Sequence, residues 1–285
     1  YIKDGPNRLD SIVASVLNNE DIFKNVTSVM VQGDTTSAFA IALAAFHRKI
    51  PVLHLEAGLR TYDLDHPYPE EFNRQAISRL AAYNLCPTAR AYSHVECERT
   101  PGKRFVVGNT VLDNLVDIEP TFTNKVIVTL HRRENHHWID QWFKEIDILA
   151  SKHPDLEFIL PIHPNPAVQK HKHLLKHVKV VDPIPYEEFT KLLAECKFAI
   201  TDSGGLQEEL SFFGKICIVC REETERKMGL GTFAYLCMKP QNLESLFDKI
   251  NNNYNSVMGV PSPYGNGKSA QKILKLIKDG YIERF

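Results

Sequence analysis

Residues 198–213 read FAITDSGGLQEELSFF and combine an apolar run, two glycines and a helical pattern. The run Phe198 to Thr201 predicts a buried strand, and Leu206 to Phe212 predicts the helix that follows it. Gly204 and Gly205 lie at the junction, where they let a ligand approach the backbone and the free N–H groups of the helix start. Glycines also form ordinary turns. In this context, however, the stretch is typical of a doubly wound α/β domain with an anion site at the turn.

The same alternation of strand and helix patterns extends in both directions from this stretch. Strands are predicted at residues 26–31, 51–55, 83–86, 104–107, 125–130, 157–161, 178–181 and 216–219. Helices are predicted at residues 7–19, 36–46, 70–80, 138–151, 185–194, 243–252 and 269–278. Strands that alternate with helices predict parallel sheets, so the expected fold class is α/β.

A polar segment at 117–124, which carries Pro120, divides the pattern into two doubly wound units. We expect an N-terminal Rossmann-like domain at 1–116, a C-terminal Rossmann-like domain at 125–262 and a closing helical segment at 263–285. Two such units predict a cleft between them, the usual place for a ligand. The first unit opens on a helix, so we expect it to be incomplete, with its first strands absent.

Composition excludes several classes of partner. The chain has 285 residues, enough for two ordinary domains, and 34 basic against 35 acidic residues give a net charge of −1. This balance does not favour a nucleic acid or an anionic membrane as a partner. No apolar run approaches the ~20 residues of a membrane-spanning helix. A site for a phosphorylated ligand must therefore be a local concentration of positive charge.

The cysteines and histidines do not predict a metal site. Cys217 and Cys220 have CxxC spacing, but they lie in a run that reads as a buried strand, where residues three apart point to opposite faces. Histidines gather at positions 136, 137, 163, 171, 173 and 177, and the lysine-rich stretch 169–177 reads as a solvated loop or helix. Free thiols favour the cytoplasm.

Carboxylates follow neighbouring strands of the first domain. Asp34 follows the predicted strand 26–31 in QGDTT, and Glu56 follows the strand 51–55 in HLEAGLRT. Glu70 opens a predicted helix after the loop HPYP. The carboxyl ends of parallel strands face one crevice, so these three segments converge there. Clustered carboxylates raise one another's pKa, which general acid–base chemistry requires.

Each of these carboxylates also has a structural interpretation. Asp34 could be the N-cap of the next helix, a role for which Asp is well suited. Glu56 could form a salt bridge with Arg60, four residues later. Glu70 and Glu71 occupy a first helical turn, where negative charge is favoured in any protein.

The second domain offers the opposite charge. His131, Arg132 and Arg133 follow its first strand, and ion pairing explains one arginine more readily than the whole cluster. Arg226, in EETER, is a further candidate partner for phosphate. Acids in one domain and an anion cradle in the other suit a diphosphate-linked substrate that is deprotonated next to its leaving group.

Six strings of residues resemble the bacterial, non-hydrolysing UDP-N-acetylglucosamine 2-epimerase family. They are HLEAGLRT at 54–61, PEEFNR at 69–74, VGNT at 107–110, HRREN at 131–135, TDSGGLQEE at 201–209 and PYGNG at 263–267. They occur in the family's order over nearly the whole chain.

The resemblance implies a two-domain, glycosyltransferase-B-like fold with the cleft described above, and no nicotinamide or metal. The implied reaction inverts carbon 2 of UDP-N-acetylglucosamine to give UDP-N-acetylmannosamine. UDP is eliminated to leave a 2-acetamidoglucal and is then added back. Family members are commonly homodimers.

The motif match also implies roles for individual residues. The acid–base carboxylates are Asp34, Glu56 and Glu70, and His131 lies beside the diphosphate and sugar. UDP binding is assigned to Arg132, Ser203, Gly204, Gly205, Glu209 and Arg226. Among these, the Ser-Gly-Gly turn holds phosphate, Glu209 the ribose hydroxyls and Arg226 the charge of the departing UDP.

Three features depart from the family pattern. Nothing matches the family's opening Gly-Thr-Arg-Pro-Glu motif, whose arginine lines the active site. The residues at 227–229 are Lys-Met-Gly where the family usually has Pro-Glu and a slightly longer loop, and Asn266 replaces a commoner Asp. Four alternatives therefore stay open: an epimerase for a modified UDP-hexosamine, a hydrolysing epimerase, a glycosyltransferase of the same architecture, and a non-catalytic nucleotide-sugar binder.

Overall fold

The first four strands of the computed structural model are short and all parallel. They pair in chain order and are β1 (Val29–Gln32), β2 (Val52–Leu55), β3 (Tyr83–Cys86) and β4 (Lys103–Val106). Parallel neighbours need a crossover connection, which helices provide here. The structure describes residues 7–283, apart from the side chain of Arg133.

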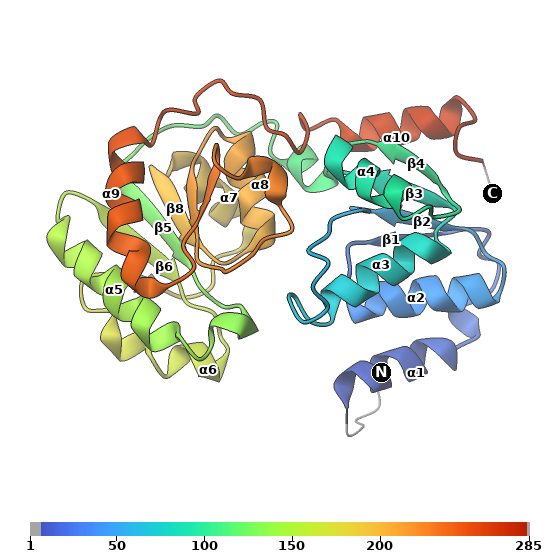
Figure 1. Ribbon diagram of the computed structural model, residues 1–285, viewed down its shortest axis with the longest axis horizontal. Coiled ribbons are helices and arrows are strands. Elements are labelled where there is room, and N and C mark those ends of the chain that lie inside the picture. Colours follow the sequence, from blue (N-terminus) through green and yellow to red (C-terminus); the bar gives the residue numbers. More distant parts are fainter. Residues whose placement is uncertain (1–6, 284–285) are drawn as a thin grey trace. The chain divides into compact units, whose positions relative to one another are not determined.

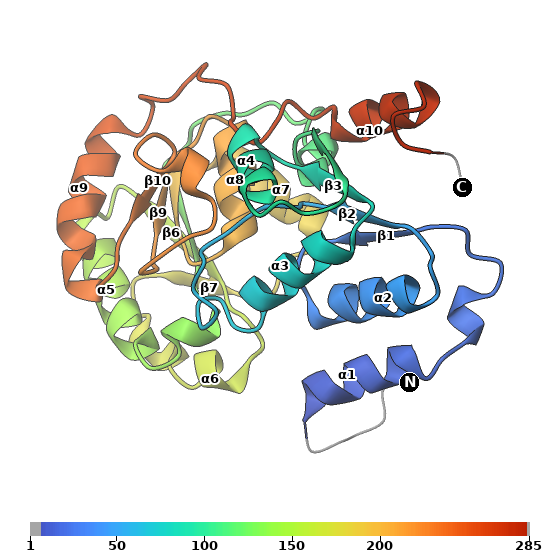
Figure 2. The ribbon, with the colours of Figure 1, turned by 45° about the vertical axis from the view of Figure 1, so that its right-hand side comes forward.

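The helices of this part of the chain pack on both faces of the four-stranded sheet. The crossovers are α2 (Thr36–His47), α3 (Glu70–Leu80) and α4 (Ala89–Cys97). Figures 1 and 2 show α1 (Arg8–Leu17) beside α2, and α2 beside α3. On the other face α10 (Ser269–Lys278) packs Ile273 in one hydrophobic cluster with Leu53 and Leu85. The alanine-rich α2 buries Ala40, Ala42 and Ala44 completely.

A second, six-stranded parallel sheet follows. Its strands are β5 (Lys125–Thr129), β6 (Glu157–Pro161), β7 (Lys179–Val181), β8 (Phe198–Thr201), β9 (Cys217–Val219) and β10 (Ala234–Leu236). They lie in the order β10-β9-β8-β5-β6-β7, so the chain reverses direction across the sheet beside β5. In open α/β sheets such a switch point, between β5 and β8 here, is where ligands bind.

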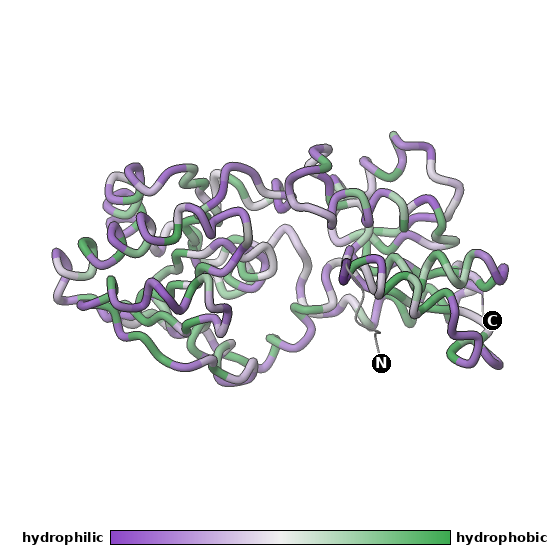
Figure 3. Tube along the Cα trace, turned by 90° about the horizontal axis from the view of Figure 1, so that it is seen from below, coloured by the Kyte–Doolittle hydropathy of each residue, from purple (hydrophilic) through white to green (hydrophobic). Residues whose placement is uncertain are grey.

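The second sheet is covered by α5 (Ile139–Lys152), α6 (Pro166–Gln169), α7 (Tyr186–Glu195), α8 (Gly204–Phe212) and α9 (Leu243–Asn253). α5 and α9 contribute most helix residues of its largest core cluster, in which Trp142, Phe158, Phe198 and Phe247 are almost fully buried. The ring of Phe247 lies 5.7 Å from that of Phe158 and 5.3 Å from that of Phe198. Figure 3 shows hydrophobic stretches of the trace concentrated in the interior of each sheet region.

The α/β class and the two parallel sheets predicted from the sequence are confirmed. The helices at 70–80 and 269–278 have the predicted bounds, whereas α4, α6 and β10 were missed. β1 begins three residues later than predicted because Val26 still belongs to a turn, in which its N–H donates to the carbonyl of Phe23. α8 begins at Gly204 and not at Leu206, so both glycines belong to its first turn.

Contacts divide the chain into unit 1, residues 1–113 and 267–285, and unit 2, residues 114–266. α10, which the sequence places in a separate closing segment, belongs to unit 1. The carboxylate of Asp113 accepts hydrogen bonds from the N–H groups of Ser269 (2.9 Å) and Ala270 (2.6 Å) and so caps this helix. Within residues 7–283 no helix is long and apolar enough to cross a membrane.

Candidate functional site

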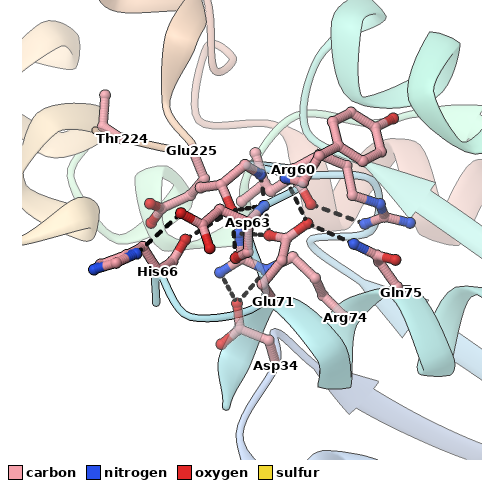
Figure 4. A network of polar contacts seen from close by, with 12 residues as sticks. Asp34, Arg60, Asp63, His66, Glu71, Arg74, Gln75, Thr224 and Glu225 are labelled. Atoms are coloured by element: carbon pink, nitrogen blue, oxygen red, sulfur yellow. Dashed lines mark hydrogen bonds and ion pairs between the residues drawn. The ribbon is translucent and has the colours of Figure 1, made fainter. Parts of the chain in front are cut away.

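Asp34 is held by an arginine from α3. Its Oδ2 accepts hydrogen bonds from Nε (3.0 Å) and Nη2 (2.6 Å) of Arg74, and its backbone carbonyl accepts one from Asn73 (2.9 Å) (Figure 4). The helix cap at this point is Thr35, whose Oγ1 accepts from the N–H of Ala38. The N-cap interpretation of Asp34 is therefore wrong. The carboxylate is held in place by a charge-assisted contact with an element 40 residues away.

Glu71 is an internal anchor and not a solvated charge at a helix start. It is completely buried, and its two carboxylate oxygens accept the N–H groups of Thr61 and Tyr62, both at 3.0 Å. Gln75 Nε2 donates to the same carboxylate at 2.9 Å, and Arg74 Nη1 lies 3.2 Å from it. The helix that begins at Glu70 thus fixes the loop after β2. Since Glu70 and Arg74 are four residues apart, both lie on one face of α3.

Glu56 is brought toward the Asp34 loop by the backbone. It has a positive φ of 64°, a conformation that non-glycine residues adopt at a cost. A β-carbon built on Gly33 would lie 3.4 Å from Oε2 of Glu56, so this carboxylate rests against the turn that precedes Asp34. The proposed salt bridge to Arg60 is wrong. Arg60 is fully buried and pairs instead with Glu98 at 2.7 and 2.8 Å.

His54 supports the same turn from within the sheet. It is fully buried on β2, and its Nε2 lies 2.8 Å from the carbonyl oxygen of Gly33. Burial lowers the pKa of His54 to about 4, so the ring is neutral at pH 7 and donates from Nε2. Asp34, Glu56 and Glu70, called here the carboxylate cluster, are thus carried on segments that His54, Glu71 and Arg74 position.

In unit 2 the predicted residues gather at the switch point. Thr129 at the end of β5 and Thr201 at the end of β8 join their hydroxyls at 2.6 Å. His131 follows β5, and its ring stacks on that of His163 with centroids 5.4 Å apart and planes at 14°. Burial lowers the pKa of His131, and the carboxylate of Asp202 partly offsets this effect.

The two glycines have different surroundings. A β-carbon on Gly204 would lie 2.7 Å from Oε1 of Glu225 and 3.0 Å from Nη1 of Arg226, so a larger residue there would displace these side chains. A β-carbon on Gly205 would meet nothing within 4 Å, so this backbone is open to a ligand. Within the described residues the side chain of Ser203, the N-cap residue, makes no cap hydrogen bond, and residues Ser203 to Gly205 are called here the anion cradle.

Glu209 lies on the second turn of α8 and accepts a hydrogen bond from the hydroxyl of Tyr186 at 2.8 Å. Burial raises the pKa of Glu209, and the bond from Tyr186 opposes that rise. The sequence did not single out Tyr186, although its place as the first residue of α7 puts it beyond the carboxyl end of β7. The hydroxyl groups of a diol such as a ribose could take the place of the Tyr186 hydroxyl on Glu209 or bind beside it.

The predicted arginines differ in their partners. Arg226 forms ion pairs with Glu208 (2.9 Å) and with Glu225. Tyr264, from the PYGNG string, donates its hydroxyl to the carbonyl of Arg226 at 2.7 Å. Arg132 forms no ion pair within residues 7–283, and its Nε is buried without a hydrogen-bond partner there. Of the two arginines Arg132 and Arg226, Arg132 is therefore the one without a carboxylate partner in the described part of the chain.

A cavity of about 260 Å³ opens at the carboxyl ends of the strands of unit 2. Its lining is mostly apolar and comprises Thr129, Leu130, His131, Pro161, Ile162, His163, Pro164, Pro183, Ile184, Phe189, Ser203 and Leu206. An apolar pocket with a few polar groups at its rim is the usual form of a small-molecule site. The cavity thus extends from the anion cradle past His131.

Neither cysteine nor histidine forms a metal centre in the described part of the chain. Among residues 7–283 there is no group of three or more His, Cys, Asp or Glu side chains that could hold a metal ion. All six cysteines are free, and Cys217 and Cys220 are completely buried on and beside β9, as their packing interpretation predicted.

The chain is similar to known proteins over most of its length. The family model for UDP-N-acetylglucosamine 2-epimerase matches residues 3–278. The UDP-N-acetylglucosamine 2-epimerase of Campylobacter jejuni is 36% identical over 290 residues, which cover 88% of this chain and 75% of that protein.

Solved structures show the same fold. The crystal structure of UDP-GlcNAc 2-epimerase from Neisseria meningitidis bound to UDP-GlcNAc is 32% identical, with a TM-score of 0.85 over 97% of this chain and 84% of that one. The S. aureus MnaA–UDP co-structure is 30% identical, with a TM-score of 0.87 over 97% of this chain and 82% of that one. These likenesses support the glycosyltransferase-B-like fold expected from the sequence. The chain belongs to the UDP-N-acetylglucosamine 2-epimerase family.

Proposed function

We propose that this protein interconverts UDP-N-acetylglucosamine and UDP-N-acetylmannosamine. The observation that carries the proposal is the pair of carboxylates beyond the carboxyl ends of β1 and β2: Asp34, which Arg74 holds, and Glu56, which lies against the Gly33 turn. The names of the relatives, and the UDP-GlcNAc and UDP in two of their structures, support the choice of substrate.

Unit 2 would hold the nucleotide. The pyrimidine and part of the ribose fit the 260 Å³ apolar cavity, and Glu209 with Tyr186 offers oxygens to the ribose hydroxyls. The diphosphate would lie on the anion cradle, where the N–H groups at the start of α8 and the side chain of Arg132 stabilise negative charge. Arg226 would meet the charge of departing UDP if its pairs with Glu208 and Glu225 rearrange.

The carboxylate cluster would carry out the proton transfers. One carboxylate takes the proton from carbon 2 while the bond from carbon 1 to the UDP oxygen breaks, which leaves a carbon 1–carbon 2 double bond and free UDP. The reverse step forms the bond to UDP again, with a proton delivered to the other face of carbon 2. Two groups on opposite faces of the sugar are needed for inversion, which a single base does not provide. In this proposal Asp34, Glu56 and Glu70 supply these groups.

Product identification tests this proposal. Incubation with UDP-N-acetylglucosamine should yield UDP-N-acetylmannosamine, separated by ion-pair chromatography and identified by its proton NMR spectrum. Free N-acetylmannosamine together with UDP would instead assign the protein to the hydrolysing class. If the protein converted only a modified UDP-hexosamine, that compound would be its substrate in place of UDP-N-acetylglucosamine. UDP binding without any product would support the non-catalytic alternative.

We further propose a cytoplasmic homodimer. The six free thiols support a reducing compartment, because exposed Cys97 and the five buried cysteines form no disulfide. Sedimentation analysis should give twice the mass of 32.5 kDa, and a monomeric mass at micromolar concentration would contradict the dimer.

A further inference from the structure

Asp202, the residue before the anion cradle, is a buried carboxylate with an unusual set of partners. It is completely buried, and no lysine or arginine side chain pairs with it in the described part of the chain. A carboxylate removed from water must be compensated by hydrogen bonds or charge. Its Oδ2 accepts three: from the N–H of His131 (2.9 Å), the N–H of Arg132 (2.8 Å) and Nδ2 of Asn135 (3.0 Å).

The other oxygen of this carboxylate faces a ring. Oδ1 of Asp202 accepts no hydrogen bond within residues 7–283, and it lies 3.4 Å from Nδ1 of His131. A small rotation of the imidazole would turn this approach into a hydrogen bond. One oxygen therefore fixes the backbone of the turn after β5, and the second is directed at the side chain that this turn carries.

The position of the ring is restricted on its other sides. His163 stacks on one face of His131, and Asn135 ties the same turn to the carbonyl of Cys220 at 2.9 Å. Nε2 of His136 lies 3.3 Å from the carbonyl oxygen of His131. The charged or titratable groups around the ring are thus Asp202, Arg132, His163 and His136, and Asp202 is the one that raises its pKa.

We infer that Asp202 is the positioning residue that sets the tautomer of His131. With Nδ1–H directed at the carboxylate, Nε2 is the nitrogen that remains for the ligand, and an imidazolium that formed there would be stabilised by Asp202. Asp202 itself touches no substrate. The catalytic meaning of this pair rests on the proposed epimerase function, in which His131 lies beside the diphosphate and sugar, whereas the tautomer is a property of the protein alone.

Nitrogen-15 NMR of the wild-type protein, without substrate, tests the inference directly. The signals of His131 are assigned by their loss in His131→Gln. At a pH above its pKa, we expect Nδ1 of His131 to carry the proton. An Nε2–H tautomer in the wild type would overturn the inference, and this test requires no variant of Asp202 to fold.

The variant Asp202→Asn tests whether Asp202 positions the ring of His131 or only anchors the turn after β5. The amide oxygen can still accept the three N–H donors, but the amide nitrogen offers only hydrogens to Nδ1. We expect the tautomer to invert, the pKa of His131 to fall, and kcat to fall by about 10²- to 10⁴-fold, with the Kd for UDP within about threefold of wild type. A variant that keeps the wild-type tautomer and titration but loses UDP affinity and thermal stability would show a structural role only.

The chain contains a matched control. Asp147 accepts the N–H groups of Lys176 (2.6 Å) and His177 (2.7 Å) through one oxygen and faces Nδ1 of His177 (3.0 Å) with the other, but this histidine is exposed. Asp147→Asn should leave turnover unchanged. If Asp202→Asn inverts the tautomer while the wild type shows no epimerisation, the positioning role stands and the proposed function fails.

Discussion

At the residue scale, the carboxylate cluster and its supports are chemically distinct. Asp34 and Glu56 lie just beyond strand ends, where a substrate can reach them, whereas Glu71 is fully enclosed although it follows directly after Glu70. Sequence patterns treat adjacent carboxylates alike. The structure distinguishes an internal anchor from a candidate catalyst, because the carboxylate oxygens of Glu71 accept hydrogen bonds from backbone N–H groups.

Neutralising the cluster should abolish turnover without loss of nucleotide binding. In Asp34→Asn and Glu56→Gln we expect kcat to fall by about 10²- to 10⁴-fold, because general acid–base catalysis contributes about that much. The Kd for UDP, measured by isothermal titration calorimetry, should stay within about threefold, because UDP binds unit 2 in this account. Glu20→Gln, which removes an exposed carboxylate, is the control. A loss of UDP affinity equal to the loss of kcat would contradict the division of roles.

The two glycines of the anion cradle should respond differently to alanine. Gly205→Ala has space for the methyl group, so we expect an unchanged melting temperature but at least tenfold weaker UDP binding, since the methyl group lies where phosphate approaches. Gly204→Ala crowds Glu225 and Arg226 and should lower stability by about 1–3 kcal/mol. Differential scanning fluorimetry and UDP titration of both variants check this, and equal destabilisation of the two would contradict it.

At the element scale, α3 organises unit 1. Its first two turns carry Glu71, Asn73 and Arg74, which together reach the loops after β1 and β2. The bounds of this helix were predictable because its apolar and charged residues follow a helical period. Its contacts were not, because an apolar pattern shows which face is buried but not which distant loop meets a particular polar side chain.

Removal of the Glu71 anchor should therefore weaken the whole unit. Glu71→Ala leaves the N–H groups of Thr61 and Tyr62 without an acceptor and Arg74 without one of its two ionic partners. We expect unfolding in urea to require about 3–5 kcal/mol less free energy than in the wild type.

The matched control for this change is Glu187→Ala, in the exposed first turn of α7. It should cost less than about 1 kcal/mol, the usual value of a carboxylate at a helix start. Similar losses for the two variants would mean that Glu71 acts merely as a helix-start charge.

The elements that the sequence missed have local reasons. β10 has three residues, too few for an alternating pattern to be read. α4 reads ARAYSHVEC, with few apolar residues, and its position becomes evident from Thr88, whose hydroxyl caps it through the N–H of Ala91. In the site, Asp202 lies inside the string TDSGGLQEE and Tyr186 inside the predicted helix 185–194, but their roles depend on partners 71 and 23 residues away.

At the scale of the whole molecule, stability should depend on pH through His54. Burial lowers the pKa of this histidine from 6.5 to about 4. The unfolded chain therefore binds a proton at higher pH than the folded chain, so stability is complete above pH 6.5 and is lost as pH falls toward 4. At about 1.4 kcal/mol per pKa unit, the loss amounts to about 3 kcal/mol.

The comparison with His54→Gln isolates this contribution, because the amide can still donate to Gly33 but takes up no proton in this range. Urea denaturation of both proteins between pH 7 and 4 should show a smaller decline for the variant, by about 3 kcal/mol. If the free energy of unfolding fell equally in both proteins, another titrating group would control the loss of stability at low pH.

The division into two α/β units was predictable because a polar, proline-bearing segment separates two runs of strand and helix patterns. The assignment of α10 to unit 1 was not, since it depends on the cap from Asp113 and on contact of Ile273 with strands nearly 200 residues earlier in the chain. That cap joins the two parts of unit 1, residues 1–113 and 267–285, which unit 2 separates in the sequence.

The most direct measurement is therefore proton NMR of the wild-type protein with UDP-N-acetylglucosamine in deuterium oxide. The account predicts UDP-N-acetylmannosamine that carries deuterium at carbon 2, and the gradual entry of deuterium at the same carbon of the remaining substrate. Product that keeps its original proton at carbon 2 would contradict proton exchange by the carboxylate cluster, and with it the central claim.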